Sequence, residues 1–168
     1  VGKWVLISSL VGVAAGITAV AFEAIIHLVR VYAIEDPAGI RGEAVVDVSG
    51  WGVFWVLFIP AWGGFLALWI TDLFAPEAEG HGTDQMIRSF HEKRGEVRPR
   101  VIAVKALASA ITIGTGGSGG QEGPVCQIGG GVGSSIADAL GLTVRERRVF
   151  LLSGASAGIG ALFGAPLG

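Results

Sequence analysis

The stretch IGTGGSGGQEGPVCQIGGGVG, residues 113–133, holds ten glycines and a single carboxylate, Glu122. Apolar segments with few charges flank it on both sides. A lone ionisable residue in such surroundings is costly to bury, so it is a candidate for a functional site. Glycines allow close approach of the backbone and leave N–H groups free to face a ligand. Backbone donors beside one movable negative charge therefore predict a site for an anion.

Composition narrows the class of protein. Of the 168 residues, 51% are hydrophobic, 15% are charged and 28 are glycine, with a mean hydropathy of +0.64. Soluble domains carry roughly 25% charged residues, whereas small residues at high hydropathy are typical of packed membrane helices. The net charge of −2 argues against a nucleic-acid-binding protein. With one cysteine, Cys126, neither a disulfide nor a cysteine metal site is available. We expect an integral membrane protein that is not an enzyme and holds no metal or cofactor.

The apolar segments predict helices of unequal length. Residues 4–32 and 48–71 are long enough to span a bilayer, and the second carries no charge. The later segments are shorter and interrupted by glycine, as in transporters whose broken helices point their N-termini at an ionic substrate. The expected elements are a polar loop at 33–47, a short polar helix at 81–92, an apolar segment at 101–114, a helix at 125–140, a polar turn at 143–148 and a second apolar segment at 149–168.

Positive charge predicts the orientation in the membrane. Residues 88–100 contain five Lys or Arg, which places this loop in the cytoplasm. The acidic loop at 33–47 is then expected outside. The cluster Arg145, Arg147 and Arg148 is left without an assigned side.

Glu122 has two interpretations. It precedes Gly123 and Pro124 near a predicted helix start, where free N–H groups and the helix dipole favour an anion. A carboxylate there can occupy the anion site itself and leave it on protonation or displacement. The alternative is a structural carboxylate paired with Lys105 or an arginine.

A second motif, EGHGTD at residues 79–84, places glycines on both sides of His81 and again exposes backbone donors. Its alternative reading is a helix start capped by Thr83 or Asp84. The glycine-rich stretch lacks the Lys-Ser/Thr pair of a phosphate-binding loop, which argues against a nucleotide site. Small residues repeat four apart between 154 and 164, which predicts helix contacts.

Both motifs resemble those of the CLC family of chloride channels and chloride/proton antiporters. GQEGPVCQIG at 120–129 is similar to the family's G-R/K-E-G-P-x-x-Q-I-G, and APEAEGHGTD at 75–84 is similar to A-P-E-A-x-G-S-G-I-P. The distance between the motifs also matches, and 154–167 resembles the following segment, which ends in N-A-P-L-A. The resemblance implies an all-α membrane protein with inverted-repeat architecture and broken, tilted helices. Residues 1–168 would form the first half of that transmembrane domain, so we expect a piece of a longer protein.

The resemblance also implies roles for individual residues. Glu122 would be the gating glutamate and proton acceptor. The transported anion, chloride or another halide, would be held by Gly80, His81, Gly82, Thr83, Gly120, Gln121, Gly123 and Pro124. The expected partners are the lipid bilayer, the second half of the same fold and a second copy in a homodimer, with no nucleic acid. The expected location is the plasma (inner) membrane of a prokaryote.

Three positions depart from the family pattern. His81 stands in place of a serine, Thr83-Asp84 in place of Ile-Pro, and Gln121 in place of Arg or Lys. An imidazole can still donate an N–H, and its protonation would make anion binding depend on pH. We expect chloride/proton antiport gated by Glu122. The alternatives are a passive voltage- or pH-gated anion channel, a fluoride- or nitrate-preferring relative, and a non-transporting membrane scaffold or sensor.

Overall fold

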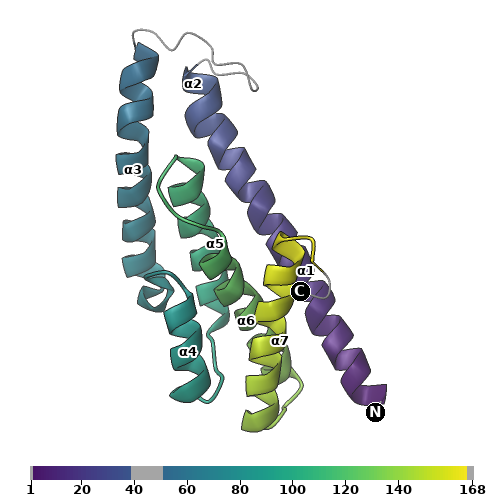
Figure 1. Cartoon of the computed structure of the whole chain (residues 1–168). Coiled ribbons are helices and arrows are strands. Elements are labelled where there is room, and N and C mark those ends of the chain that lie inside the picture. The colour runs from purple at the N-terminus through teal and green to yellow at the C-terminus, as the bar shows by residue number, and fades with distance from the viewer. Residues whose placement is uncertain (1, 39–50, 166–168) are drawn as a thin grey trace.

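Helices form all the regular structure in the part of the chain that the computed structural model describes, residues 2–38 and 51–165 (Figure 1). The expected all-α architecture is therefore confirmed. In chain order the elements are α1 (Gly2–Arg30), a π-helical turn (Val31–Glu35), α2 (Asp36–Ala38), α3 (Trp51–Phe74), a 3₁₀ turn (Pro76–Ala78), α4 (Thr83–His91), α5 (Pro99–Gly114), α6 (Glu122–Ala139) and α7 (Val144–Leu162).

Helix α1 contacts the rest of the bundle through one stripe. Its buried residues recur every three or four positions, so they lie on one face of the helix. They are Ile7, Val11, Ala15, Ala19, Phe22 and Ile26. The opposite face is also apolar, with exposed residues such as Leu6 and Val13. A helix that is apolar on all sides suits a hydrocarbon surrounding.

Helix α3 is even less covered. Gly2–Glu35 and Gly52–Phe74 are both long and apolar enough to cross a membrane. Only 11% of the most apolar 18-residue stretch of Gly52–Phe74 is buried. Its contact with α5 is close at Gly63, where an added Cβ would lie 2.0 Å from Thr115 Oγ1. The exposed aromatic residues of α3 include Phe58, Trp62 and Trp69.

The tightest packing is between α6 and α7, where backbone meets backbone. A Cβ on Gly129 would lie 2.3 Å from the Gly154 carbonyl oxygen, and one on Gly154 would lie 2.2 Å from the Gly129 oxygen. One turn on, a Cβ on Gly133 would lie 2.0 Å from the Phe150 oxygen. Of the small residues predicted to make helix contacts between 154 and 164, Gly154 and Gly158 do so, whereas an added Cβ on Gly160 or Gly164 would meet no other helix.

A buried serine fixes the connector between α4 and α5 to α6. Ser134 is fully buried; its hydroxyl accepts from the Val97 N–H at 3.1 Å and donates to the Gly95 carbonyl at 2.8 Å. Gly95 has φ +77, and a side chain there would meet Arg148. The basic connector is therefore held against both α6 and α7.

Two expected boundaries are wrong. The polar turn expected at 143–148 is the first turn of α7, because Thr143 and Glu146 form a capping box that starts a helix. The polar loop expected at 33–47 begins later, because the helical chain continues through Glu35 to Ala38. The remainder of that loop, residues 39–47, lies outside the described residues.

The arginine cluster of α7 lies at the same end of the bundle as the 88–100 loop. Arg148 Nη2 donates to the His91 carbonyl at 3.3 Å, and the α6–α7 junction lies beside the lower end of α4 in Figure 1. Whichever side of the membrane holds the 88–100 loop therefore also holds Arg145, Arg147 and Arg148.

Candidate anion site

The two motifs singled out in the sequence meet at the N-termini of α4 and α6. A Cβ on Gly82 would lie 2.6 Å from the Gly123 carbonyl oxygen, and one on Gly123 would lie 2.1 Å from the His81 carbonyl oxygen. Gly82 also has φ +104, a conformation that other residues rarely adopt. Glycine at both positions is what allows the two helix starts to touch.

Both helix starts leave backbone donors free. The first hydrogen bond of α4 runs from the Met86 N–H to the Gly82 carbonyl, and that of α6 runs from the Val125 N–H to the Gln121 carbonyl. The N–H groups ahead of those donors have no partner within their helices. Within the described residues no side chain caps either start. Free N–H groups and the positive end of the helix dipole favour a negative charge at this place.

A cavity of about 330 Å³ opens beside the two helix starts. Four of the predicted anion-binding residues line it: Gly80, His81, Gly120 and Pro124. Of the other predicted residues, Gly82 and Gly123 form the contact between the segments, Thr83 is the first residue of α4, and Gln121 is the N-cap of α6.

Lys105 lies on the wall of this cavity and is only 4% exposed. Its ammonium donates to the Ala78 carbonyl at 3.0 Å and to the Gly80 carbonyl at 2.5 Å. Because these carbonyls point toward Lys105, they are held in a fixed direction immediately before the His81 turn. Burial of a cation costs free energy, which a negative charge in the adjoining cavity would offset.

The alternative interpretation, in which Glu122 pairs with Lys105 or an arginine, is wrong for the described residues. Among the described residues Glu122 forms no ion pair, and Lys105 bonds only to backbone carbonyls. The signal in the sequence that points to Lys105 is its position as the single charge in the apolar segment 101–114.

Glu122 is the first residue of α6, three residues earlier than expected for the start of this helix. Its side chain is exposed, so the expectation of a buried carboxylate is wrong for the described chain. The carboxylate folds back over Gly120, where an added Cβ would lie 2.1 Å from Glu122 Oε2. Gly120 lines the cavity, so the carboxylate lies at its margin.

His81 and Thr83 contact each other at the start of α4. His81 Nδ1 lies 3.1 Å from Thr83 Oγ1, and this bond takes up one ring nitrogen. The helix cap is the backbone of Gly82, not the side chain of Thr83 or Asp84, so the capping alternative is wrong. The exposed imidazole keeps its second nitrogen available beside the cavity.

Comparison with known proteins agrees with this arrangement. The sequence model of the family described as "Voltage gated chloride channel" matches residues 63–168. The chain therefore belongs to the voltage-gated chloride channel (CLC) family, and it is part of an integral membrane protein.

Curated relatives include the H(+)/Cl(-) exchange transporters ClcA of Cronobacter sakazakii and Klebsiella pneumoniae (strain 342). The first is 35% identical over 164 residues and the second 32% over 165 residues, each match covering 96% of this chain and 34% of the relative. The chain thus spans about a third of the length of these relatives. A crystal structure of a slow cyanobacterial Cl-/H+ antiporter superposes with a TM-score of 0.77 at 27% identity, covering 96% of this chain and 37% of that one.

Proposed function

We propose that this chain supplies one half of the anion path of a transporter that exchanges chloride for protons, with Glu122 as the gate and proton acceptor. The observation that carries the proposal is the meeting of two uncapped helix N-termini at one cavity that Lys105 also lines. The relatives named as H(+)/Cl(-) exchange transporters support the choice of ion and of exchange.

The arrangement gives each group a role in binding. The free N–H groups of α4 and α6 and the Lys105 ammonium stabilise an anion in the cavity. The Glu122 carboxylate, held over Gly120, is itself an anion at the margin of the same cavity and competes for the same positive potential. When Glu122 takes up a proton it becomes neutral, loses that attraction and leaves the position to chloride. Alternation between the two forms links anion movement to proton movement.

The remaining parts of the proposal concern the whole protein. A second half of the same fold would close the cavity from the other side and supply further donors. A homodimer in the inner membrane of a prokaryote, with one path in each subunit, is the proposed assembly. His81 would offer its second ring nitrogen to the anion, since the first contacts Thr83.

Flux measurements on the full-length protein in liposomes test the proposal. An outward chloride gradient is expected to drive protons inward, and Glu122→Gln is expected to retain chloride flux while proton movement stops, since the amide cannot take up a proton. Glu96→Gln, which removes an exposed carboxylate from the α4–α5 connector, is the matched control and should leave coupling intact. Chloride flux that drives no protons in the unmodified protein would replace exchange by a passive channel.

A further inference from the structure

Helix α5 presents a polar stripe to the cavity of the candidate anion site. Lys105, Ser109 and Thr112 stand at i, i+4 and i+7, so they share one face of the helix. All three line the cavity of about 330 Å³ beside the two helix starts. From Val101 to Gly114 the other residues of α5 are apolar or glycine. A polar stripe on an otherwise apolar helix indicates a wall that meets a polar ligand.

The three hydroxyl groups in this lining differ in what they offer to a ligand. Thr71 donates to the Ala67 carbonyl at 2.8 Å, and Thr112 donates to the Ala108 carbonyl at 2.9 Å. The hydrogens of both threonines are used within their own helices, so these hydroxyls can present only lone pairs, which repel an anion. The third hydroxyl, that of Ser109, is not used in this way.

Ser109 is the hydroxyl of this lining that has a hydrogen to offer. In the described ranges, 2–38 and 51–165, it forms no hydrogen bond. Serines elsewhere in the bundle do bond to their own helix, because Ser135 donates to the Gly131 carbonyl and Ser153 to the Val149 carbonyl. The Ser109 oxygen is also within reach of a ligand, since it is not among the enclosed side-chain atoms that lack a partner. An anion in the cavity can therefore accept from it.

Lys105, one helical turn before Ser109, has one hydrogen left over. An ammonium carries three donors, and two of them go to the carbonyls of Ala78 and Gly80. Within the described part of the chain the third donor has no partner. The carboxylate in the same lining, that of Glu79, is exposed, whereas Lys105 is only 4% exposed. Because a buried charge is screened less by salt and water, Lys105 determines the potential beside Ser109.

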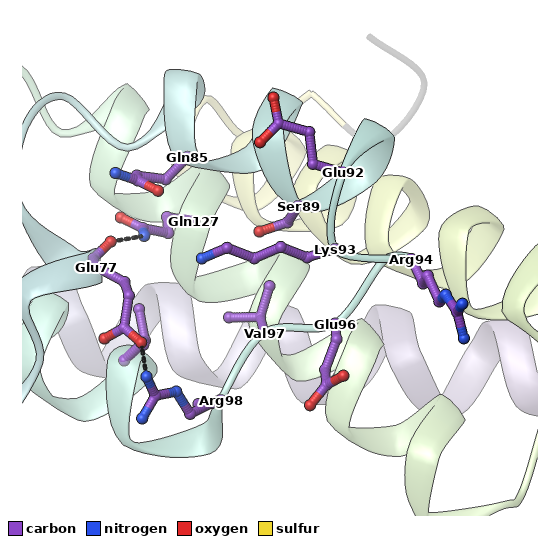
Figure 2. A pocket seen from close by; sticks show the side chains of 11 residues that line it. Glu77, Gln85, Ser89, Glu92, Lys93, Arg94, Glu96, Val97, Arg98 and Gln127 are labelled. Carbon is purple, nitrogen blue, oxygen red and sulfur yellow. Dashed lines mark hydrogen bonds and ion pairs between the residues drawn. The ribbon is translucent and has the colours of Figure 1, made fainter.

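The turn that accepts from Lys105 is itself held in place by further contacts. In the turn at Pro76–Ala78, the Glu77 carbonyl accepts from Gln127 Nε2 at 3.1 Å, and the Glu77 carboxylate pairs with Arg98. Figure 2 shows both contacts at the edge of a neighbouring cavity of about 420 Å³. The lining of that cavity holds three acidic and three basic residues, so it offers an anion no net attraction. The cavity beside Lys105 and Ser109 is the better place for one.

We propose that Ser109 is an anion-binding residue that favours chloride over larger halides. Residues four apart on a helix have Cβ atoms about 5–6 Å apart, so one ion between the two side chains accepts from both the Ser109 hydroxyl and the remaining Lys105 N–H. The attraction between a donor and a monatomic anion falls as the ionic radius grows, so the hydroxyl stabilises chloride more than iodide. This assignment rests on the proposed function, and it adds to the anion site a residue that lies outside both glycine-containing motifs.

Calorimetric titration of the purified full-length protein with chloride and with iodide tests the proposal. Ser109→Ala deletes the hydroxyl, and alanine suits a helix, so the variant should fold. We expect its chloride affinity to fall by about tenfold, the loss of one hydrogen bond to a charged partner, and its iodide affinity to fall by about threefold. Thr112→Val is the matched control on the same wall. Its hydroxyl hydrogen is already used within α5, so chloride affinity should not fall.

Ser109→Cys separates hydrogen bonding from packing, because a thiol fills nearly the same space but is a weak donor. It should lose chloride affinity as Ser109→Ala does, and full affinity in Ser109→Cys would overturn the proposal. Unchanged affinity in Ser109→Ala, or an equal loss in Thr112→Val, would overturn it too. In each of these outcomes the unmodified protein still binds chloride, so the anion site stands without Ser109. Absence of chloride binding by the unmodified protein would instead refute the proposed function, and this assignment with it.

Discussion

The N-termini of α6 and α7 are built in opposite ways, although the two helices pack against each other. At α7 the Glu146 N–H donates to Thr143 Oγ1 at 3.4 Å, and the Thr143 N–H donates to Glu146 Oε2 at 2.7 Å. At α6, and at α4 beside it, no side chain among the described residues satisfies the first N–H groups. The capped start stabilises helix α7, whereas the uncapped starts beside the cavity leave their N–H groups free to bind a ligand.

The largest effect is expected from a substitution that forces the uncapped N-termini of α4 and α6 apart. Gly123→Ala places a Cβ 2.1 Å from the His81 carbonyl, so the two helix starts must separate. Overpacking of this kind costs up to about 3 kcal/mol, and we expect chloride affinity to fall by about 100-fold. Calorimetric titration of the full-length protein measures it. Gly16→Ala on α1, where an added Cβ meets nothing within 4 Å, is the matched control; equal loss in both variants would contradict the assigned contact.

Removing the cation of the anion site should have the next largest effect. Lys105→Met deletes the bonds to the Ala78 and Gly80 carbonyls together with the positive charge beside the cavity. Hydrogen bonds from a charged donor contribute about 1.5–3 kcal/mol, so about a tenfold loss of chloride affinity is expected. Arg100→Met removes the same charge from the exposed face of α5 and should bind chloride normally. Unaltered affinity in Lys105→Met would show that the helix starts act without it.

His81 should modulate the uncapped start of α4 more weakly. His81→Ala removes the ring nitrogen that remains available beside the cavity, so we expect a loss of chloride affinity. The side chain is exposed, so the loss is at most about 1 kcal/mol, or fivefold. Calorimetric titration of the full-length protein at one fixed pH measures it. His27→Ala, which removes an exposed imidazole from α1, is the matched control; an equal loss in both variants would contradict a role for His81 at the site.

Removing the cap at the start of α7 should have the smallest effect on chloride flux. Thr143→Ala removes a cap worth about 1 kcal/mol of unfolding free energy, and chloride flux should not change. Donation from the Thr143 N–H and then from its hydroxyl, at 2.8 Å, lowers the pKa of Glu146, which lies outside both spanning helices, and Thr143→Ala removes the hydroxyl's share. A lowered carboxyl pKa stabilises the folded state near neutral pH, and this contribution is lost as the pH falls through the lowered value.

Thermal unfolding scans at neutral and acid pH should therefore show a difference between Thr143→Ala and the unmodified protein that shrinks in acid. Val144→Ala, an exposed substitution one residue further along, is the control for a change at this helix start. A large loss of flux in Thr143→Ala would end the distinction between the two kinds of helix start.

The convergence of His81 and Glu122 could be predicted from the sequence because both lie in short, specific motifs. The role of Lys105 could not be predicted from the sequence, because its partners are the backbone carbonyls of Ala78 and Gly80. Every residue has a backbone carbonyl, so the residue type gives no indication of such a partner. The start of α7 was predictable and was missed. Thr143 and Glu146 have the spacing of a capping box, and the density of arginines around them was read instead as a turn.

The exposure of Glu122 also escaped prediction, for a different reason. Val125, three residues on and on the same face of α6, is buried, but Glu122 is the first residue of that helix and its carboxylate turns back over Gly120. The apolar residues around Glu122 in the sequence predict that α6 is buried, but they do not predict which way the side chain of its first residue turns.

The glycine contact between α6 and α7 restricts how the site can move. With Gly129 and Gly154 backbone to backbone and Gly133 against Phe150, neither helix can slide along or rotate against the other without a collision of main-chain atoms. The pair moves as one rigid unit, carrying the arginines at the base of α7 with it. Any cycle of opening and closing at the head of α6 is therefore confined to the side chain of Glu122, or else it displaces the arginines at the start of α7 in the same step.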